Sequence, residues 1–352
     1  MVAYIHDGST CPYALACYTF SMTDLSDTAQ QLLTPGKGIL AADESTASAD
    51  KRLTEYGIAP SVEMRRQYRD LFLATPGIEA YLSGVILYQE TLSQDSDAGV
   101  PFVKGLRSHG IIPGIKVDEG TEPMQESPEE LITKGLLGLS ERLQTFREKY
   151  HTGFTKWRAV IRIEGDRLPT AHAIVENAKR LATYAQEVQR AGMVPIVEPE
   201  VLLDGKHSRL RSRQVIEATL IALMDALTDA GVDLSGVILK TSMALSGSDT
   251  HKTDTPEEVA LDTVGALMKA VPRGLAGIVF LSGGQGSDQA IRNLQAIVKE
   301  ARNQKAPWPL TFSYARAFQD EALTIWAGDE ANQQKAREAF MARLQQATQA
   351  LT

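Results

Sequence analysis

Residues 155–200 read TKWRAVIRIEGDRLPTAHAIVENAKRLATYAQEVQRAGMVPIVEPE, and the order of patterns in this stretch decides the fold. Two short apolar runs, Thr155–Ile161 and Val194–Glu200, have the length and composition of buried strands. Between them, apolar residues recur every three or four positions, as on one face of a helix. These residues are Ile174, Ala178, Leu181, Ala185 and Val188. A strand, a helix and a second strand in this order predict two parallel strands joined by a helix.

The same unit recurs along the chain. Six further runs have the character of buried strands: Gly38–Asp43, Gly84–Tyr88, Gly114–Asp118, Gly236–Met243, Gly277–Ser282 and Leu310–Arg316. Helical patterns lie between them, such as Val264, Leu267 and Val271 after Pro256. Strands and helices alternating in this number favour a closed (β/α)₈ TIM barrel of the α/β class over an open doubly wound sheet. No G-x-G-x-x-G dinucleotide motif follows the first strand, which weakens the open-sheet alternative further.

Composition limits the possible partners. The chain has 352 residues, of which 43% are apolar, and this suffices for one large domain with a sizeable core. Lys and Arg number 36 and Asp and Glu number 44, which gives a net charge of −8. An acidic protein is a poor partner for nucleic acid or for an anionic membrane surface. We therefore expect neither partner, and no apolar run is long enough to span a membrane.

The N-terminal region lacks a targeting pattern. No Lys or Arg occurs before Lys37, so the cationic start of a signal or transit peptide is missing. Cys11 and Cys17 show no disulfide framework, and a reducing compartment is the default. We expect a cytoplasmic protein with a loosely ordered extension over residues 1–22, a barrel domain over residues 23–352, and a C-terminal helical segment within that domain.

Polar residues at the ends of the expected strands are the candidates for chemistry, because barrels of this type carry the active site at the C-terminal ends of their strands. Charges there are costly to bury unless they are paired or used. The candidates are Asp43, Lys116, Asp118, Lys156, Arg158, Glu198, Glu200, Lys240, Ser282, Ser313 and Arg316.

Lys240 is the sharpest candidate, because it ends the apolar run Gly236–Leu239, where an ammonium group is poorly solvated. Burial lowers the pKa of a lysine, and a second cation such as Lys156 lowers it further. A neutral amine can attack a carbonyl carbon and form a Schiff base. The alternative is a structural ion pair between Lys240 and Glu198 inside the barrel, and the pattern leaves both interpretations open.

Glu198 and Glu200 flank Pro199, so both side chains leave the same face of their strand. Two carboxylates this close raise the pKa of one of them, which is a common source of a carboxylic acid near neutral pH. In the alternative interpretation, Lys156 and Arg158 neutralise the two carboxylates. Both interpretations can hold, with one glutamate doing chemistry and the other orienting a base.

Two groups of residues have the composition of phosphate sites. Loops after the seventh and eighth barrel strands commonly bind phosphate through backbone N–H groups and a cation, and glycine permits a close backbone approach. The first group, in those loops, comprises Ser282, Gly283, Gly284, Ser313 and Arg316. The second group, across the same face, comprises Ser45, Ser48, Lys51, Arg52 and Lys116. Two phosphate sites with a lysine and carboxylates between them predict a small bisphosphorylated substrate.

Metal chemistry has no support in the sequence. The six histidines show no metal-ligand spacing, none lies at an expected strand end, and we expect each to be a surface residue.

Seven motifs together resemble one family. They are PGKGILAADEST (Pro35–Thr46), GIKVD (Gly114–Asp118), KWR (Lys156–Arg158), VPIVEPE (Val194–Glu200), ILK (Ile238–Lys240), FLSGGQ (Phe280–Gln285) and SYARA (Ser313–Ala317). From about residue 22 to the end, the chain closely resembles the class I fructose-bisphosphate aldolases and keeps the motifs in their order. The resemblance implies a metal-free and cofactor-free (β/α)₈ enzyme of glycolysis and gluconeogenesis, assembled as a homotetramer. It would cleave fructose 1,6-bisphosphate reversibly to dihydroxyacetone phosphate and glyceraldehyde 3-phosphate.

The resemblance also implies roles for individual residues. Lys240 would form the Schiff base, Glu198 would act as acid and base in carbinolamine dehydration, and Lys156 would stabilise charge beside it. Asp43 would take the proton of the C4 hydroxyl. Ser282, Gly283 and Arg316 would bind the C1 phosphate, and Ser45, Ser48, Arg52 and Lys116 the C6 phosphate. Further substrate-binding residues would be Arg158, Glu200 and Ser313.

The chain departs from the family pattern in three places. Ala315 stands where animal members have Gly, so a methyl group lies in the expected phosphate site. Thr241 and Ser242 replace the usual Pro-Asn after the lysine. No tyrosine follows Tyr314, whereas a C-terminal tyrosine helps to move the enamine proton in animal members. We expect Glu198 to move that proton here.

Other functions remain as alternatives. A metal-dependent barrel enzyme would need a ligand set that the sequence does not show. A non-catalytic scaffold on an aldolase frame would be free to lose Lys240, Glu198 or Asp43, and all three are present. Another sugar bisphosphate, sedoheptulose 1,7-bisphosphate, or fructose 1-phosphate could also be a substrate.

Overall fold

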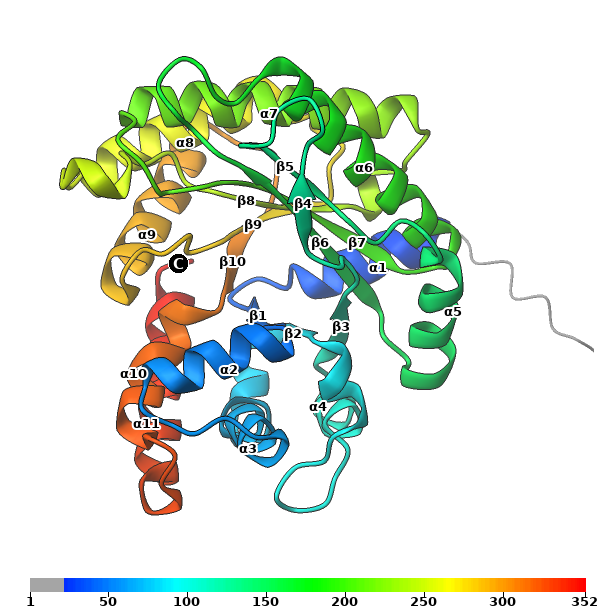
Figure 1. The fold of residues 1–352 in the computed structure, drawn as a ribbon, viewed down its shortest axis with the longest axis vertical. Coiled ribbons are helices and arrows are strands. Elements are labelled where there is room, and N and C mark those ends of the chain that lie inside the picture. The colour runs from blue at the N-terminus through cyan, green and yellow to red at the C-terminus, as the bar shows by residue number, and fades with distance from the viewer. Residues whose placement is uncertain (1–21) are drawn as a thin grey trace, which may run out of the picture.

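The computed structural model describes residues 22–352, and eight parallel strands in it close into a barrel (Figure 1). The strands are β1 (Gly38–Ala42), β2 (Leu82–Leu87), β3 (Ile112–Lys116), β6 (Phe154–Ile161), β7 (Val194–Val201), β8 (Ile238–Thr241), β9 (Gly277–Phe280) and β10 (Leu310–Tyr314). Their order around the barrel is β1-β10-β9-β8-β7-β6-β3-β2, so the last strand pairs with the first. The predicted (β/α)₈ barrel is confirmed.

The inner face of the barrel changes from apolar to charged along the strands. Side chains two residues apart share a face, so Ile196 and Glu198 of β7 both point inward, as do Ile238 and Lys240 of β8. The isoleucines are fully buried, and the helix α1 (Met22–Leu32) closes that end of the barrel. The α1 face consists of Leu25, Ala29 and Leu32. The charged residues therefore lie at the opposite, C-terminal end of the strands.

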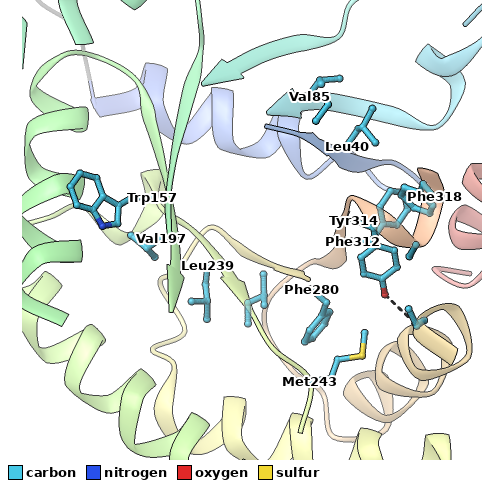
Figure 2. Close-up of a cluster of buried hydrophobic side chains, with 14 of the residues drawn as sticks. Leu40, Val85, Trp157, Val197, Leu239, Met243, Phe280, Phe312, Tyr314 and Phe318 are labelled. Carbon is cyan, nitrogen blue, oxygen red and sulfur yellow. Dashed lines mark hydrogen bonds between the residues drawn. The ribbon is translucent and has the colours of Figure 1, made fainter. Parts of the chain in front are cut away.

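Helices surround the barrel and cover the outer faces of its strands. They are α2 (Thr46–Glu55), α3 (Val62–Leu73), α4 (Phe102–Ser108), α5 (Leu139–Tyr150), α6 (Ala171–Arg190), α7 (Arg209–Asp229), α8 (Pro256–Ala270), α9 (Ser287–Asn303), α10 (Arg316–Trp326) and α11 (Gln333–Gln349). Figure 2 shows outward-facing strand residues in the layer between strands and helices, among them Trp157, Val197, Leu239, Phe280 and Phe312. This continuous apolar layer fixes the barrel that carries the site.

The helices begin where the sequence provides caps. The Thr170 hydroxyl accepts a hydrogen bond from the Ala173 N–H at the start of α6, which contains the predicted apolar face. At the start of α8, Thr255 and Glu258 form a reciprocal capping box, and Pro256 occupies the first helical position. These local signals explain why the helices follow their strands after short loops.

Several boundaries differ from the sequence-based expectation. Gly236 lies in a 3₁₀ turn (Leu234–Gly236) before β8, and Arg316 begins α10 instead of ending β10. A short antiparallel pair, β4 (Thr121–Pro123) and β5 (Leu131–Thr133), was not predicted. The expected C-terminal helical segment is α11. The expected extension, residues 1–22, lies outside the described residues except for Met22, the first residue of α1.

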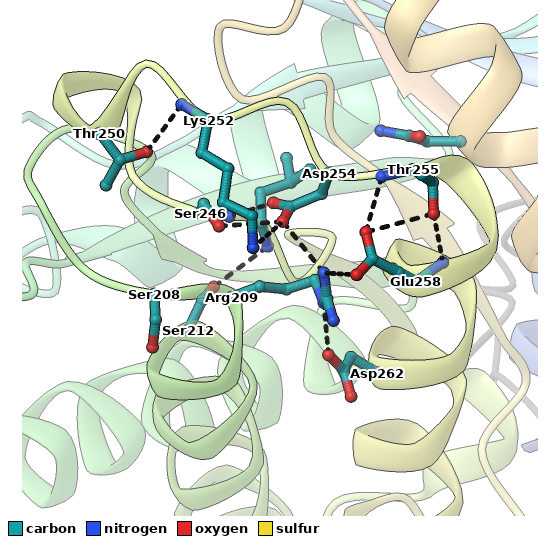
Figure 3. A network of polar contacts seen from close by, with 12 residues as sticks. Ser208, Arg209, Ser212, Ser246, Thr250, Lys252, Asp254, Thr255, Glu258 and Asp262 are labelled. Carbon is teal, nitrogen blue, oxygen red and sulfur yellow. Dashed lines mark hydrogen bonds and ion pairs between the residues drawn. The ribbon is translucent and has the colours of Figure 1, made fainter.

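The loop between β8 and α8 is held by a polar network (Figure 3). The Asp254 carboxylate is buried and accepts hydrogen bonds from the Ser246 N–H (2.7 Å) and the Ser246 hydroxyl (3.0 Å). Arg209 of α7 pairs with the same carboxylate at 3.0 Å and with Asp262 of α8 at 2.6 Å. The loop that follows Lys240 is thus tied to both neighbouring helices. Within residues 22–352, no helix has the length and apolar character of a membrane span.

Candidate active site

One cleft of about 840 Å³ opens at the C-terminal end of the barrel strands. Except for Gly284, every residue that the sequence assigned to the site lines this cleft. They come from seven strands or the loops that follow them, and from α2 and α10. The structure thus brings the sequence-predicted residues together, although up to 273 positions separate them along the chain, from Asp43 to Arg316 (316 − 43 = 273).

Four of these residues form a continuous chain of ion pairs. Lys240 Nζ lies 3.0 Å from Glu198 Oε1, and Lys156 Nζ lies 3.2 Å from Glu198 Oε2. Lys156 Nζ also lies 2.6 Å from Asp43 Oδ2. Lys156, Glu198 and Lys240 are buried, so each charge depends on its partners more than on water. The two lysines and two carboxylates balance one another.

Electrostatics keep two members of this chain ionised. Burial alone would raise the pKa of Asp43, but the attraction of Lys156 and Lys240 outweighs it and holds the pKa below its ordinary value. Burial would lower the pKa of Lys156, yet Asp43 and Glu198 raise it well above the ordinary value. At neutral pH, Asp43 is therefore an anion and Lys156 a cation. The predicted Lys240–Glu198 ion pair exists, and the contact is compatible with both interpretations of Lys240.

A second set of pairs lies beside the first. The Arg158 guanidinium pairs with Glu200, and the Arg158 backbone N–H donates to Asp118 Oδ2 at 3.3 Å. Lys116 Nζ lies 2.6 Å from Asp118 Oδ1 and donates to the Asp118 carbonyl at 2.7 Å. Glu198 and Glu200 therefore share one face, as predicted, and each is neutralised by different cations. Lys116 and Arg158 are only half-buried, so both reach the cleft.

The expected C6-phosphate group surrounds the start of α2. The Ser45 hydroxyl caps this helix by accepting from the Ser48 N–H, and the two hydroxyls lie 3.0 Å apart. Arg52, four residues after Ser48, is buried and held by Asp320 at 2.5 Å, with Glu44 at 3.9 Å. The guanidinium thus already has two carboxylate partners, whereas the serine hydroxyls face the cleft.

The expected C1-phosphate group lies in the same cleft, between β9 and α10. Gly283 and Gly284 adopt φ angles of 59° and 92°, which favour glycine. A Cβ atom on Gly284 would lie 3.5 Å from an Arg316 guanidinium nitrogen, so the glycine loop and the arginine are neighbours. The Ser313 hydroxyl is buried without a hydrogen-bond partner. No side chain caps α10, so its first N–H groups remain available to an anion.

Sequence reasoning missed several residues of the cleft. Glu44 lines it and accepts from the Tyr68 hydroxyl at 2.8 Å, and Arg142 of α5 reaches it from the side. Glu44 directly follows Asp43 and could have been found as part of the same strand end, whereas nothing in the sequence indicates Arg142. The expectation that each histidine is a surface residue is wrong for His207, which is buried. His6 lies outside the described residues.

Metal ligands do not gather in the part of the chain that the structure describes: no three His, Cys, Asp or Glu side chains there could hold a metal ion. The polar cleft is lined by cations from both sides, with a lysine and carboxylates at its centre. Fold and cleft together define the class of protein, a barrel enzyme that acts on a small anionic substrate.

Comparisons with known proteins agree on one family. The chain matches the model of fructose-bisphosphate aldolase class-I over residues 24–352. It is 47% identical over 312 residues to a probable fructose-bisphosphate aldolase class 1 of Xanthomonas campestris, covering 88% of this chain and 91% of that one. It is 46% identical over 321 residues to human fructose-bisphosphate aldolase C, covering 91% and 87%. The chain belongs to the class I fructose-bisphosphate aldolase family.

A solved structure agrees with this result. The aldolase of Plasmodium falciparum, determined in complex with TRAP and a small-molecule inhibitor, superposes with a TM-score of 0.90 at 42% identity, covering 94% of each chain. The predicted activity is therefore confirmed: the reversible cleavage of fructose 1,6-bisphosphate to dihydroxyacetone phosphate and glyceraldehyde 3-phosphate. The family performs this glycolytic reaction without metal, through a lysine Schiff base.

Proposed function

We propose that Lys240 is the Schiff-base lysine of this aldolase and that Glu198, Lys156 and Asp43 complete its catalytic group. The contact that carries this proposal is the Glu198 carboxylate, which lies within 3.0 Å of Lys240 Nζ and 3.2 Å of Lys156 Nζ. A carboxylate in this position can accept the proton that Lys240 must release before it attacks a carbonyl carbon.

The chemistry then follows from these positions. The free amine of Lys240 adds to the C2 carbonyl of the sugar, and Glu198 returns a proton to the oxygen that leaves as water. The resulting iminium withdraws the electron pair of the C3–C4 bond. Asp43, an anion at neutral pH, accepts the proton of the C4 hydroxyl as that bond breaks. Glu198, which regains a proton from water after the dehydration, then protonates C3 of the enamine. Asp43 returns its proton to water, and hydrolysis of the imine frees Lys240.

Lys156 has an electrostatic role in this scheme. Its ammonium group lies between Asp43 and Glu198, and both carboxylates change charge during the reaction. A fixed cation between them stabilises whichever carboxylate is ionised. Because its pKa lies well above the ordinary value, Lys156 keeps its charge throughout.

The substrate phosphates define the orientation of the sugar. We assign the C1 phosphate to Ser282, Gly283, Ser313 and Arg316 and the C6 phosphate to Ser45, Ser48, Arg52 and Lys116. The unpartnered, buried hydroxyl of Ser313 supports the first assignment, because a buried polar group without a partner is costly unless a ligand completes it. Arg158 and Glu200 would contact the sugar hydroxyls between the two phosphates.

Assembly and location belong to the same proposal. We infer a cytoplasmic homotetramer, as the family resemblance implies. Apolar side chains exposed on the outer faces of α7 and α8 support an oligomeric surface. They are Leu210, Ile221, Leu261 and Met268. Light scattering should give about four times the chain mass of 38.3 kDa. A monomer at micromolar concentration would contradict the tetramer.

Borohydride trapping tests the central assignment. Reduction in the presence of dihydroxyacetone phosphate should inactivate the enzyme and add the mass of the reduced ligand to the peptide that contains Lys240. The folded Lys240→Arg variant should take up no label. A label on Lys156, or inactivation without a label, would contradict the assignment.

A further inference from the structure

The proposed catalytic pair bridges two strands whose backbone pairing ends just before it. β7 and β8 pair at Ile196↔Ile238 and Val197↔Leu239, and the register stops there. Glu198 and Lys240 are the next residues on their strands. Their side-chain contact of 3.0 Å therefore lies beyond the last backbone pair of the two strands.

Proline explains why the pairing stops. The Val194 N–H donates to the Gly153 carbonyl and the Leu202 N–H to the Ile161 carbonyl, so even-numbered N–H groups of β7 face β6. The β6–β7 register runs without a shift, and the odd-numbered groups consequently face β8. Residue 199 is one of these, and as a proline it has no N–H to donate.

Ser242 joins the two strands again beyond this gap. Its hydroxyl accepts a hydrogen bond from the Val201 N–H at 3.0 Å and donates one to the Val201 carbonyl at 2.9 Å. Both residues are about 5% exposed, so water cannot replace these bonds. A hydroxyl is both donor and acceptor, and a single serine can therefore satisfy both groups of one peptide residue.

We propose that Ser242 is a positioning residue that aligns Lys240 with Glu198. On β8, Lys240 lies between Leu239, which pairs with Val197, and Ser242, which bonds Val201. On β7, Glu198 lies between the same two partners, Val197 and Val201. This inference rests on the catalytic roles proposed above for Lys240 and Glu198. It assigns a role to the second of the two positions after Lys240, where Thr241 and Ser242 replace the family's Pro-Asn.

The rest of the loop is fixed independently of Ser242. The Ala244 N–H donates to the Thr263 hydroxyl at 2.9 Å, and the Ser246 N–H donates to Asp254 at 2.7 Å. Loss of the Ser242 hydroxyl should therefore loosen the β7–β8 contact beside Lys240 and leave the loop in place. Thr263 is a matched control, because it is also buried and its hydroxyl also accepts a hydrogen bond from one backbone N–H.

Kinetics of Ser242→Ala test the inference. The rate of imine formation with dihydroxyacetone phosphate and kcat should both fall about tenfold to 100-fold, because small misplacements of reacting groups are costly. KM for fructose 1,6-bisphosphate should stay within about twofold, since the phosphate groups belong to other loops. Ser242→Thr, which keeps the hydroxyl, should restore kcat to within about twofold of the wild type. Thr263→Val should lower Tm as much as Ser242→Ala does while leaving kcat within about twofold.

Opposite results overturn the inference. Wild-type imine formation in Ser242→Ala would do so, as would an equal loss of kcat in Thr263→Val. Ser242→Cys keeps the side-chain shape with a larger terminal atom and weakens both hydrogen bonds. It replaces the alanine variant if that protein does not fold. Borohydride labelling of the wild type distinguishes a failure of the proposed function from a failure of this inference. Label on a residue other than Lys240 would overturn both. Label on Lys240, together with unchanged kinetics in Ser242→Ala, would overturn this inference alone.

Discussion

Glu198 holds two lysines with one carboxylate, and this makes its charge more important than its shape. Replacement by glutamine keeps the volume but removes the proton acceptor and both ion pairs. We expect Glu198→Gln to lower kcat by about 10²-fold or more, the usual scale for a lost acid–base group. Solvent-deuterium exchange into dihydroxyacetone phosphate should fall in parallel, because the same carboxylate protonates the enamine.

Glu200→Gln is the control for this variant. Glu200 lies two residues further along the same strand, lines the same cleft and pairs with Arg158 instead of the lysines. In Glu200→Gln, the rates of deuterium exchange and of cleavage should not show the large joint fall expected for Glu198→Gln. If Glu198→Gln cleaves slowly but exchanges at the wild-type rate, another group protonates the enamine.

Ala315 places a methyl group at the start of α10, in the wall of the proposed C1-phosphate site. Its φ angle of −113° lies outside the left-handed region that favours glycine. Ala315→Gly should therefore lower KM for fructose 1,6-bisphosphate by allowing a closer approach, with Tm nearly unchanged. An unchanged or raised KM, measured by steady-state kinetics, would show that the phosphate does not approach this backbone.

The raised pKa of Glu44 predicts the direction in which the free energy of unfolding changes with pH. Burial raises the pKa of Glu44 above its ordinary value, and the attraction of Arg52 does not cancel this. A carboxyl group with a raised folded pKa destabilises the fold as pH rises above its unfolded pKa of about 4.3. Glutamine does not titrate. The free energy of unfolding of Glu44→Gln minus that of the wild type should therefore increase from pH 4 to pH 7 in urea titrations, and a flat or falling difference would contradict this.

At the scale of elements, the sequence predicts the strands and helices that have a regular pattern of apolar residues. All eight barrel strands and the helix α6 were predicted, because β-branched runs and a 3.6-residue period are local properties. The β4–β5 pair was not predicted, since every β4 residue is exposed and no apolar pattern marks it. The Arg52–Asp320 pair joins residues 268 positions apart, and no local pattern encodes such a contact. The cleft was predictable because strand ends converge, whereas the partner of each charge was not.

The β8–α8 loop depends on one buried carboxylate. Asp254→Ala would leave the Ser246 N–H and Arg209 without their partner. We expect the free energy of unfolding to fall by about 2–3 kcal/mol, since a buried charged acceptor is lost. Lys252→Ala is the control: this exposed lysine lies 3.6 Å from Asp254, and its loss should cost less than about 0.5 kcal/mol. Equal effects in urea unfolding would contradict the buried role of Asp254.

At the scale of the molecule, the barrel separates the binding of the substrate from the cleavage of its bond. The strand ends carry the lysines and carboxylates, and the two proposed phosphate groups lie at the start of α2 and between β9 and α10. The apolar face of α1 closes the N-terminal end of the barrel, so the charged layer faces the opening at the C-terminal end. The distance between the two proposed phosphate groups, which belong to distant parts of the chain, then sets the length of substrate that fits. This arrangement assigns the two phosphates to different residues.

Separate residues for the two phosphates predict a different substrate dependence for two variants. Lys116→Met removes a cation from the proposed C6 site, so it should raise KM for fructose 1,6-bisphosphate about tenfold and leave KM for fructose 1-phosphate unchanged. Arg316→Met removes the cation of the proposed C1 site and should raise KM for both substrates by about tenfold. Steady-state kinetics on both sugars, with Tm as a check on folding, make the comparison. If Lys116→Met weakened fructose 1-phosphate as strongly as the bisphosphate, Lys116 would contact the C1 end, and the proposed orientation of the sugar across the barrel would be reversed.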